Sequence, residues 1–180
     1  MTAPDDEVCL DDAVRIVAEL MAVSARTAPK TMGTDILEIK IIKGKCKDKL
    51  AAEMRRLDRE GRHNYERDSQ AIEASPAVLL IGVKPHSGVG LNCAACGFDS
   101  CAAFNEASTS ADFKGPNCML RLLDLGIALG SAAKTASMHN VDNRLMIRIG
   151  VAARSVGLTK TNVCCGIPLT ATGKSPFFDR

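Results

Sequence analysis

Helical and strand-like hydrophobic patterns mix along the chain without a regular strand–helix–strand repeat, so the sequence predicts an α+β fold. The main observations are strand patterns at residues 36–42 and 77–83 and a helical pattern from residue 118 to about residue 137. The length of 180 residues suits one domain with a substantial core. We therefore expect residues 1–180 to form a single domain.

The N-terminal quarter predicts a helix, a loop and a strand. A helix is expected over residues 12–24, with Asp11 or Asp12 as its cap. Residues 27–33 contain a proline and a glycine and are expected to form a loop. Residues 36–42 alternate apolar and charged side chains, which predicts a half-buried strand. The broad apolar face of the helix comprises Ala13, Val14, Ile16, Val17, Leu20 and Met21.

Two further helices are predicted before the second strand. The first covers residues 47–60, with Leu50, Met54 and Leu57 on its inner face, and the second covers residues 65–74. Residues 77–83 form a short apolar run between two prolines. This pattern predicts a central, fully buried strand.

The C-terminal half predicts two more helices and a short strand. The long helix at residues 118–137 is expected to turn Leu120, Leu123, Ile127 and Ala128 inward. A helix at residues 144–156 would bury Leu145, Ile149, Ala152 and Ala153 and end at Gly157. Residues 162–180 are expected to contain a short strand and a tail that covers the core or docks on a partner.

Composition and charge exclude several classes of protein. A net charge of +2 gives no argument for nucleic-acid or membrane-surface binding. The acidic N-terminal stretch lacks the features of a signal peptide, and no apolar run is long enough to span a membrane. We therefore expect a cytoplasmic protein. Thiols stay reduced in that compartment, so the eight cysteines favour metal or redox chemistry over disulfides.

Half of the cysteines form one dense pattern. Cys93, Cys96, Cys101 and Cys118 are spaced C-x2-C-x4-C-x16-C within 26 residues. Ligation by four cysteines is typical of iron–sulfur clusters. Gly97 would let the backbone curl around the site, and a short helix at residues 101–107 would carry Cys101 in its first turn. The pattern predicts a [4Fe–4S] site with a remote fourth ligand.

Other interpretations of these thiols stay open. A structural zinc site also uses four cysteines, but its usual signature contains two C-x2-C pairs. Plant-type [2Fe–2S] proteins use the reverse order of spacings, C-x4-C-x2-C. The remaining alternative is that the four cysteines carry no ligand.

The other cysteines and the histidines give weaker signals. Cys164 and Cys165 are adjacent, so their side chains would point in opposite directions along an extended chain. We expect them in the core or in a turn, and a redox role is the alternative. Cys9 and Cys46 are isolated. His86 precedes the cysteines closely enough to lie near the site.

The chain shows two family resemblances. The stretch NCAACGFDSCAAF, followed by Cys118, resembles the small four-cysteine [4Fe–4S] module of anaerobic electron-transfer proteins. That module reads roughly C-G-x-C-G-x-x-x-C, so Ala94 replaces its first glycine and Gly97 keeps the second. The stretches SARTAPKTMGTDILEI, SPAVLLIGV, LLDLGIALGSAAKTA and CCGIPLTATGKSPFFDR resemble the ferredoxin-domain proteins of anaerobic bacteria and archaea over nearly the whole chain.

The second family in turn resembles a shortened nitroreductase. This implies a nitroreductase-like sheet with packed helices, a homodimer, and a cluster-binding segment inserted at residues 86–118. It also raises FMN as a cofactor, although the N-terminal arginine stretch of nitroreductases is absent and Asp35 would disfavour an anionic flavin. Arg26, Lys30 and Lys134 are the candidates for a flavin phosphate site, and solvated surface charges are the alternative.

Three functions follow as hypotheses. The first is a redox protein with one [4Fe–4S] cluster that transfers electrons to a redox partner protein, which the sequence does not identify. The second is a structural or sensing module in which the cluster stabilises a partner-binding loop. The third is an FMN-dependent reductase of a small substrate, so the sequence leaves open whether the protein is an enzyme.

Overall fold

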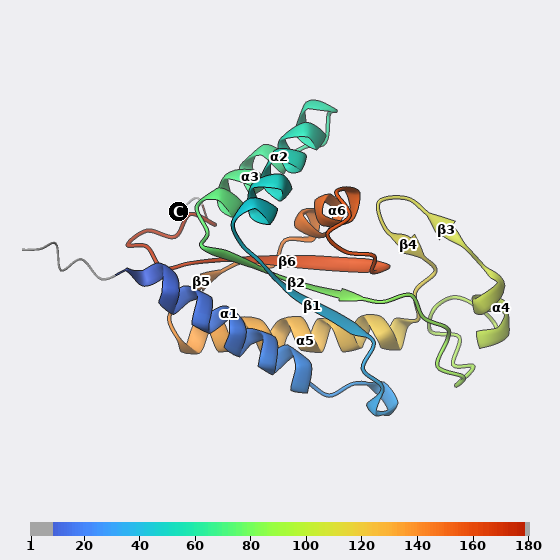
Figure 1. Ribbon diagram of the computed structural model, residues 1–180. Helices are drawn as coiled ribbons and strands as arrows, with labels where there is room; N and C mark the ends of the chain where they lie inside the picture. The colour runs from blue at the N-terminus through green and yellow to red at the C-terminus, as the bar shows by residue number, and fades with distance from the viewer. Residues whose placement is uncertain (1–8, 179–180) are drawn as a thin grey trace, which may run out of the picture.

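A four-stranded antiparallel sheet in the order β1-β2-β6-β5 forms the centre of the fold (Figure 1). The computed structural model describes residues 9–178. Its sheet contains β1 (Leu37–Ile42), β2 (Ala77–Val83), β5 (Asp142–Asn143) and β6 (Val163–Thr170). Every residue of β2 is buried, which confirms the predicted central strand. β6 is more than the short strand expected, because it pairs with the whole of β2.

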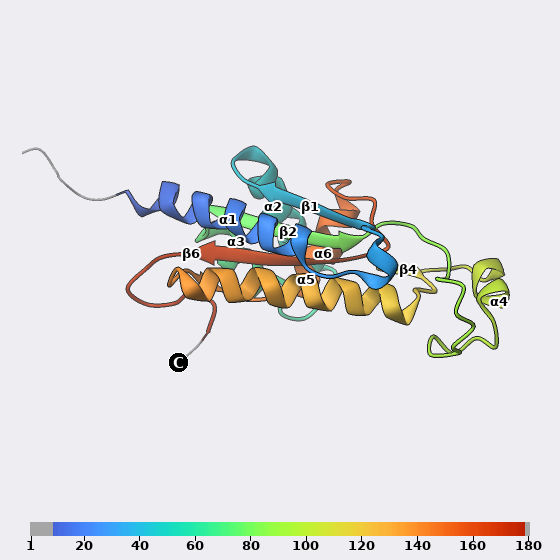
Figure 2. The same ribbon diagram turned by 90° about the horizontal axis from the view of Figure 1, so that it is seen from below.

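Helices cover both faces of the sheet and give three layers (Figures 1 and 2). On one face lie α1 (Leu10–Thr27) and α5 (Met119–Met138), and on the other lie α2 (Lys45–Arg59), α3 (Tyr65–Glu73) and α6 (Ile147–Ser155). Along β2, Leu79 and Ile81 enter the core under α1 and α5. Val78 and Leu80 enter the core on the opposite side. The arrangement confirms the α+β class.

Two glycines allow α6 to pack directly on β6. A Cβ atom on Gly150 of α6 would lie 1.8 Å from the carbonyl oxygen of Cys164. A Cβ atom on Gly166 of β6 would lie 2.2 Å from Cγ2 of Ile149. Because interiors are close-packed, neither position accepts a larger residue unless helix and strand move apart.

The inner faces of two helices are narrower than the sequence predicts. In α1, Ile16 and Leu20 are 59% and 41% exposed, while Val14, Val17 and Met21 face the core as expected. The helix also starts earlier than predicted, with Cys9 as its N-cap and Asp11 and Asp12 in the first turn. The sheet covers only part of the apolar face of α1, so that face was predicted too wide.

The predicted inner face of α5 is wrong at Leu123 and Ile127, which are 52% and 47% exposed. The reason is a buried ion pair on the opposite side of the helix. Asp124 accepts hydrogen bonds from the backbone N–H and hydroxyl of Thr31, at 2.7 and 2.8 Å. Arg121 donates to the carbonyl oxygen of Thr31 and to Asp124, at 3.1 and 3.2 Å. These contacts fix the rotation of α5 and turn the two apolar side chains outward.

The C-terminal region shows one more difference and two agreements. Leu145 was expected inside a helix but is 44% exposed, because α6 begins only at Ile147. Gly157 ends the helical region with φ +73, as predicted. Phe177 is buried, and Arg144 donates to its carbonyl oxygen at 2.6 Å, so the tail covers the core of its own chain. Residues 179 and 180, and residues 1–8 on which the signal-peptide prediction largely rests, lie outside the described residues.

No helix within residues 9–178 has both the length and the apolar character needed to cross a membrane.

Candidate metal centre

The cysteine segment extends from one end of the sheet (Figure 1). It leaves the end of β2 and returns to the chain's longest described helix, α5. Between them lie α4 (Cys101–Glu106) and a small hairpin of β3 (Thr109–Ser110) and β4 (Lys114–Gly115). Residues 86–118, which the sequence predicts to be an inserted cluster-binding segment, lie in this extension.

All four predicted ligands line one pocket. Cys93 and Cys96 lie in the irregular loop, Cys101 begins α4, and Cys118 is the N-cap of α5. All four are free thiols. Cys93 is exposed, Cys96 and Cys101 are half-buried, and Cys118 is 5% exposed. The pocket therefore opens to solvent at Cys93 and is closed at Cys118.

The loop before Cys101 has an unusual backbone. Gly90, Asn92, Ala94 and Gly97 all have φ between +48 and +88. Residues that carry a side chain rarely adopt this left-handed backbone conformation, so an alanine there is strained by about 1 kcal/mol. The N–H of Gly97 donates to the carbonyl oxygen of Ala94 at 2.9 Å and closes the turn that holds Cys96. The conformation of Ala94 gives a physical reason for the glycine that the resembling module has at this position.

Neighbouring side chains hold Cys101 in place. Asn92 Oδ1 accepts a hydrogen bond from the backbone N–H of Cys101 at 2.8 Å. Ser100 caps α4 by accepting from the N–H of Ala103 at 3.1 Å. A Cβ atom on Gly88 would lie 3.0 Å from Cβ and 3.1 Å from Sγ of Cys101. Gly88 thus gives Cys101 room to face the pocket.

His86 binds the backbone of Cys118, which places it beside the candidate ligands. Its Nε2 accepts a hydrogen bond from the N–H of Cys118 at 3.1 Å. Its Nδ1 lies 2.9 Å from the carbonyl oxygen of Lys84. Because a carbonyl oxygen can only accept, Nδ1 is the donor in this contact. The sequence suggested only that His86 is close, and the bond to Cys118 was not predicted.

Two aromatic rings shield the pocket. Phe98 and Phe104 line it and meet edge to face, with ring centroids 5.7 Å apart. Phe104 is 2% exposed and also stacks on His86. Phe113, the third phenylalanine of the segment, packs instead against the core beneath α2 and α6. Two aromatic side chains therefore limit the access of water to the thiols.

The thiols are close together but are not arranged around one ion. The free space between them is about 10 Å³, room for roughly one water molecule. Within residues 9–178, no set of three or more His, Cys, Asp or Glu side chains has the geometry to hold a metal ion. A larger inorganic group would need a wider pocket than the thiols enclose here, and Cys93 is the exposed one of the four.

The remaining cysteines lie elsewhere. Cys164 and Cys165 are buried in the two cores on opposite faces of the sheet, as predicted. Burial raises the pKa of Cys164 to about 12 and that of Cys165 to about 11, so both stay protonated thiols. Cys9 and Cys46 are exposed and do not line the pocket.

The three candidate flavin-phosphate cations are not gathered in one free site. Arg26 pairs with Asp35 at 2.5 Å and also donates to the carbonyl oxygen of Leu37. The Lys30 ammonium donates to three backbone carbonyl oxygens at the end of α1, those of Ala25, Arg26 and Ala28. Lys134 is exposed on α5. Arg26 and Lys30 therefore stabilise the turn after α1, and this set does not fit a phosphate.

Comparison with known proteins agrees with this fold. Residues 114–180 match the family described as "uncharacterized protein containing a ferredoxin domain (DUF2148)", and this range includes Cys118. An uncharacterized protein of Archaeoglobus fulgidus is 47% identical over 171 residues, which cover 94% of this chain and 93% of the relative.

Solved structures similar to this chain include nitroreductases. A nitroreductase-like family protein from Bacillus cereus has a TM-score of 0.57 at 12% identity, and the match covers 99% of this chain and 83% of that one. A nitroreductase with bound FMN from Desulfitobacterium hafniense has a TM-score of 0.51 at 14% identity, covering 94% and 82%. The chain thus belongs to the family of uncharacterized proteins containing a ferredoxin domain, and its fold resembles that of the nitroreductases.

Proposed function

We propose that this protein holds one [4Fe–4S] cluster on Cys93, Cys96, Cys101 and Cys118 and transfers single electrons. The observation that carries the proposal is the pocket lined by all four free thiols. Four thiolates are the usual protein ligands of such a cluster, and the family description names a ferredoxin domain.

The spacing of the cysteines in the sequence favours a cluster over a structural zinc site. The usual zinc signature contains two C-x2-C pairs. This chain has one such pair, Cys93 and Cys96, followed by Cys101 and the remote Cys118. Four cysteine thiolates are the usual protein ligands of a [4Fe–4S] cluster.

Residues around the pocket would position and shield the cluster. Asn92 and His86 fix the backbone at Cys101 and Cys118 through hydrogen bonds to their N–H groups. Phe98 and Phe104 exclude water from one side. Such contacts tune the potential of a metal site. Cys93 is the exposed candidate ligand, so we expect a partner protein to receive electrons on that side.

Anaerobic purification with iron and sulfide counts, followed by EPR of the reduced protein, tests the proposal. We expect about four irons and four sulfides per chain. A Cys96→Ser variant should lose the visible chromophore, whereas the matched control Cys46→Ser should keep it. Full iron and an unchanged spectrum in Cys96→Ser would contradict the ligand assignment.

A redox titration separates electron transfer from a structural or sensing role. A reversible one-electron couple supports transfer. A cluster that cannot be reduced, or that degrades on reduction, supports a module that stabilises a partner-binding loop.

FMN-dependent reduction of a small substrate is a second candidate, favoured by the fold shared with FMN-bound nitroreductases. Arg26 is paired with Asp35, and Lys30 binds carbonyl oxygens at the end of α1, so a flavin phosphate would need other partners. Denaturing the purified protein and measuring released flavin decides the matter. Absence of flavin at any stoichiometry would remove this candidate.

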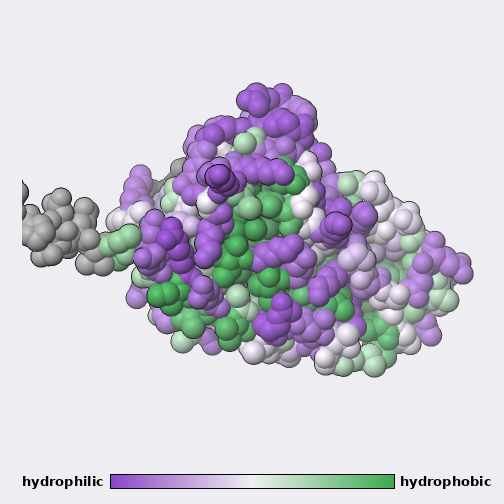
Figure 3. All heavy atoms as spheres, viewed as in Figure 1, coloured by the Kyte–Doolittle hydropathy of each residue, from purple (hydrophilic) through white to green (hydrophobic). Residues whose placement is uncertain are grey.

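A homodimer is part of the same proposal. Hydrophobic residues reach the surface over α1 and the edge strand β1 (Figure 3). On α1 the exposed apolar residues follow one helical face, with Ile16, Leu20 and Val23 between 41% and 59% exposed. Contiguous apolar surface of this kind marks interaction sites. Light scattering should give twice the chain mass, and an Ile16→Glu/Val23→Glu double variant should give the mass of one chain.

A further inference from the structure

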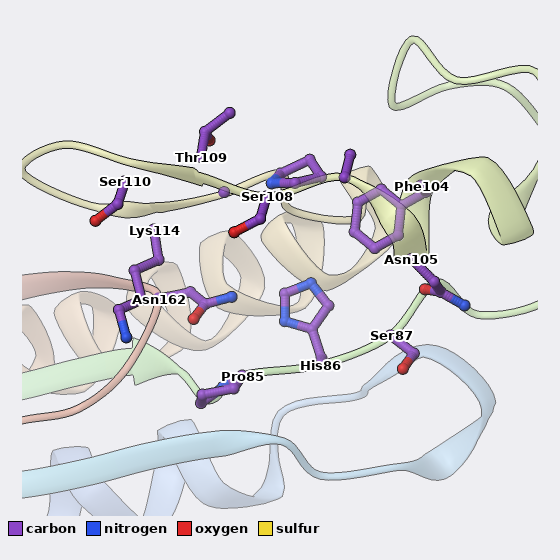
Figure 4. A pocket seen from close by; sticks show the side chains of 13 residues that line it. Pro85, His86, Ser87, Phe104, Asn105, Ser108, Thr109, Ser110, Lys114 and Asn162 are labelled. Atoms are coloured by element: carbon purple, nitrogen blue, oxygen red, sulfur yellow. The ribbon is translucent and has the colours of Figure 1, made fainter.

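A second cavity lies beside the metal centre and shares a wall with it. It encloses about 470 Å³ and lies between the end of β2, α4 and the β3–β4 hairpin (Figure 4). Phe104 lines both this cavity and the cysteine pocket. His86 lines the cavity while its Nε2 accepts from the N–H of Cys118. These two side chains connect the cavity with the candidate metal centre.

The lining of the cavity is polar and carries positive charge. It includes Lys114, whose ammonium makes no ion pair or hydrogen bond with the described residues. None of the described residues that line the cavity is an aspartate or a glutamate. Hydrogen-bond donors on the wall come from the hydroxyls of Ser87, Ser108, Thr109 and Ser110. A cavity of this kind suits a negatively charged oxygen ligand.

Asn162 supplies a second, independent sign of a ligand. The residue is 8% exposed, and its backbone is fixed by hydrogen bonds to Val83, Lys114 and Arg154. Its side-chain amide forms no hydrogen bond with the described residues and points into the cavity (Figure 4). Because the rest of the residue is buried, the amide is accessible from the cavity side. The amide N–H₂ group is therefore placed to donate to a molecule in the cavity.

We propose that this cavity binds a small organic oxyanion, a carboxylate or a phosphate ester, through Lys114 and Asn162. Its volume falls within the roughly 300–1,000 Å³ range of small-molecule sites and exceeds what inorganic phosphate alone would fill. A ligand there would lie next to the proposed cluster. This link to the cluster rests on the proposed function, and it makes the small molecule a candidate substrate or effector of the metal centre. Binding itself does not depend on iron.

Calorimetric titration of the anaerobically purified protein tests the site with three probes: inorganic phosphate, ribose 5-phosphate and succinate. We expect ribose 5-phosphate or succinate to bind more tightly than inorganic phosphate, and the one that binds identifies the class. Asn162→Asp keeps the size of the side chain but replaces the donor with a negative charge. Loss of a hydrogen bond to a charged group should weaken binding roughly tenfold to a hundredfold in Asn162→Asp and in Lys114→Ala.

Lys43→Ala is the matched control, because Lys43 is an exposed lysine that follows Ile42, at the end of β1 away from the cavity. It should leave the affinity unchanged. Lys114 is also exposed, so the Lys114→Ala variant should fold. It therefore still tests the site if the Asn162→Asp variant does not fold. No binding of any probe, or equal affinities in the wild type and the Lys114→Ala variant, would overturn the site. A protein that binds the probe but lacks iron would refute the cluster proposal alone.

Discussion

The chain uses cysteine in two opposite ways, in the body of the fold and in the loop beyond it. In the body, Cys164 and Cys165 are neighbours in β6, yet their side chains enter different cores on opposite faces of the sheet. In the loop, four cysteines up to 25 positions apart in sequence line a single pocket. Distance in sequence therefore says little about which thiols can share a ligand.

Backbone geometry accounts for the difference. An extended strand alternates its side chains between two faces, so adjacent thiols diverge. The loop instead contains residues with left-handed backbone conformation, among them Ala94 and Gly97, and it curves around the cysteine pocket. Burial raises the pKa of both strand thiols, whereas the loop leaves Cys93 open to solvent. Cysteine is thus a protonated core residue in one region and a candidate metal ligand in the other.

Exchanging one cysteine for serine in each region should give opposite results, and this is the largest effect we expect. Cys118→Ser should lose most of the bound iron. Cys165→Ser should keep its iron but lower the free energy of unfolding by about 1–3 kcal/mol, because it buries a hydroxyl in an apolar core. Iron analysis and chemical denaturation measure the two outcomes. Equal iron loss in both variants would contradict the assignment of Cys118 as a ligand and of Cys165 as a core residue.

Adding one methyl group to a glycine should separate the regions in the same way. In the body, Gly150→Ala would place a Cβ atom against the carbonyl of Cys164 and should lower the free energy of unfolding by about 1–3 kcal/mol or more. In the loop, Gly88→Ala would press on Cys101 and should lower iron occupancy with little change in the melting temperature. Gly126→Ala, where a Cβ atom meets nothing within 4 Å, is the control.

Alkaline pH should destabilise the body through its two buried thiols. Their pKa values rise from an ordinary 9.0 to about 12 for Cys164 and about 11 for Cys165. The unfolded chain therefore releases these protons first, so their contribution to stability is complete below about pH 9 and is lost as the pH rises toward 12. The loss is up to about 1.4 kcal/mol per pH unit for each thiol.

Denaturation midpoints between pH 8 and 11 measure this loss. A Cys164→Ala variant should show a flatter decline than the wild type over that range. An equally steep decline in the variant would assign the alkaline sensitivity to other groups.

The smallest expected effect concerns an ion pair that joins the two regions. Arg62, which follows α2, donates two hydrogen bonds of 2.6 Å to Asp112 in the hairpin of the extension. Both side chains are more than a third exposed, so Arg62→Ala should lower the free energy of unfolding by less than about 1 kcal/mol. The difference in the free energy of unfolding between the wild type and Arg62→Ala should shrink in high salt. A larger loss that does not depend on salt would contradict a simple surface ion pair.

The body was largely predictable because its signals are local. Alternation along residues 36–42 and the apolar run at residues 77–83 identify two strands, and Leu50, Met54 and Leu57 mark the inner face of α2 as predicted. The inner face of α5 was not predictable in this way. Its rotation depends on Asp124 binding Thr31, a contact between residues 93 positions apart that no periodicity reveals.

The candidate metal centre was predictable only as a set of thiols. Cysteine spacing indicates Cys93, Cys96, Cys101 and Cys118, and a glycine at 97 suggests a tight turn. The contacts that support them come from Asn92, His86 and Gly88, whose roles depend on the three-dimensional path of the loop. Asn162 gives no signal at all in the sequence, because β6 brings it to the cavity from the far end of the chain.

The position of β6 in the sheet has a consequence for the order of events during synthesis. This strand lies between β2 and β5 but is the last of the described strands to leave the ribosome, so the centre of the sheet is incomplete until residue 170 has been made. All four loop cysteines emerge before it. The pairing of β2 with β6 must close a long loop that contains the cysteine segment, and such closures are slow. A nascent chain can thus present its thiols to iron while its sheet is still unfinished, and early metal loading would shorten the loop that β6 has to close.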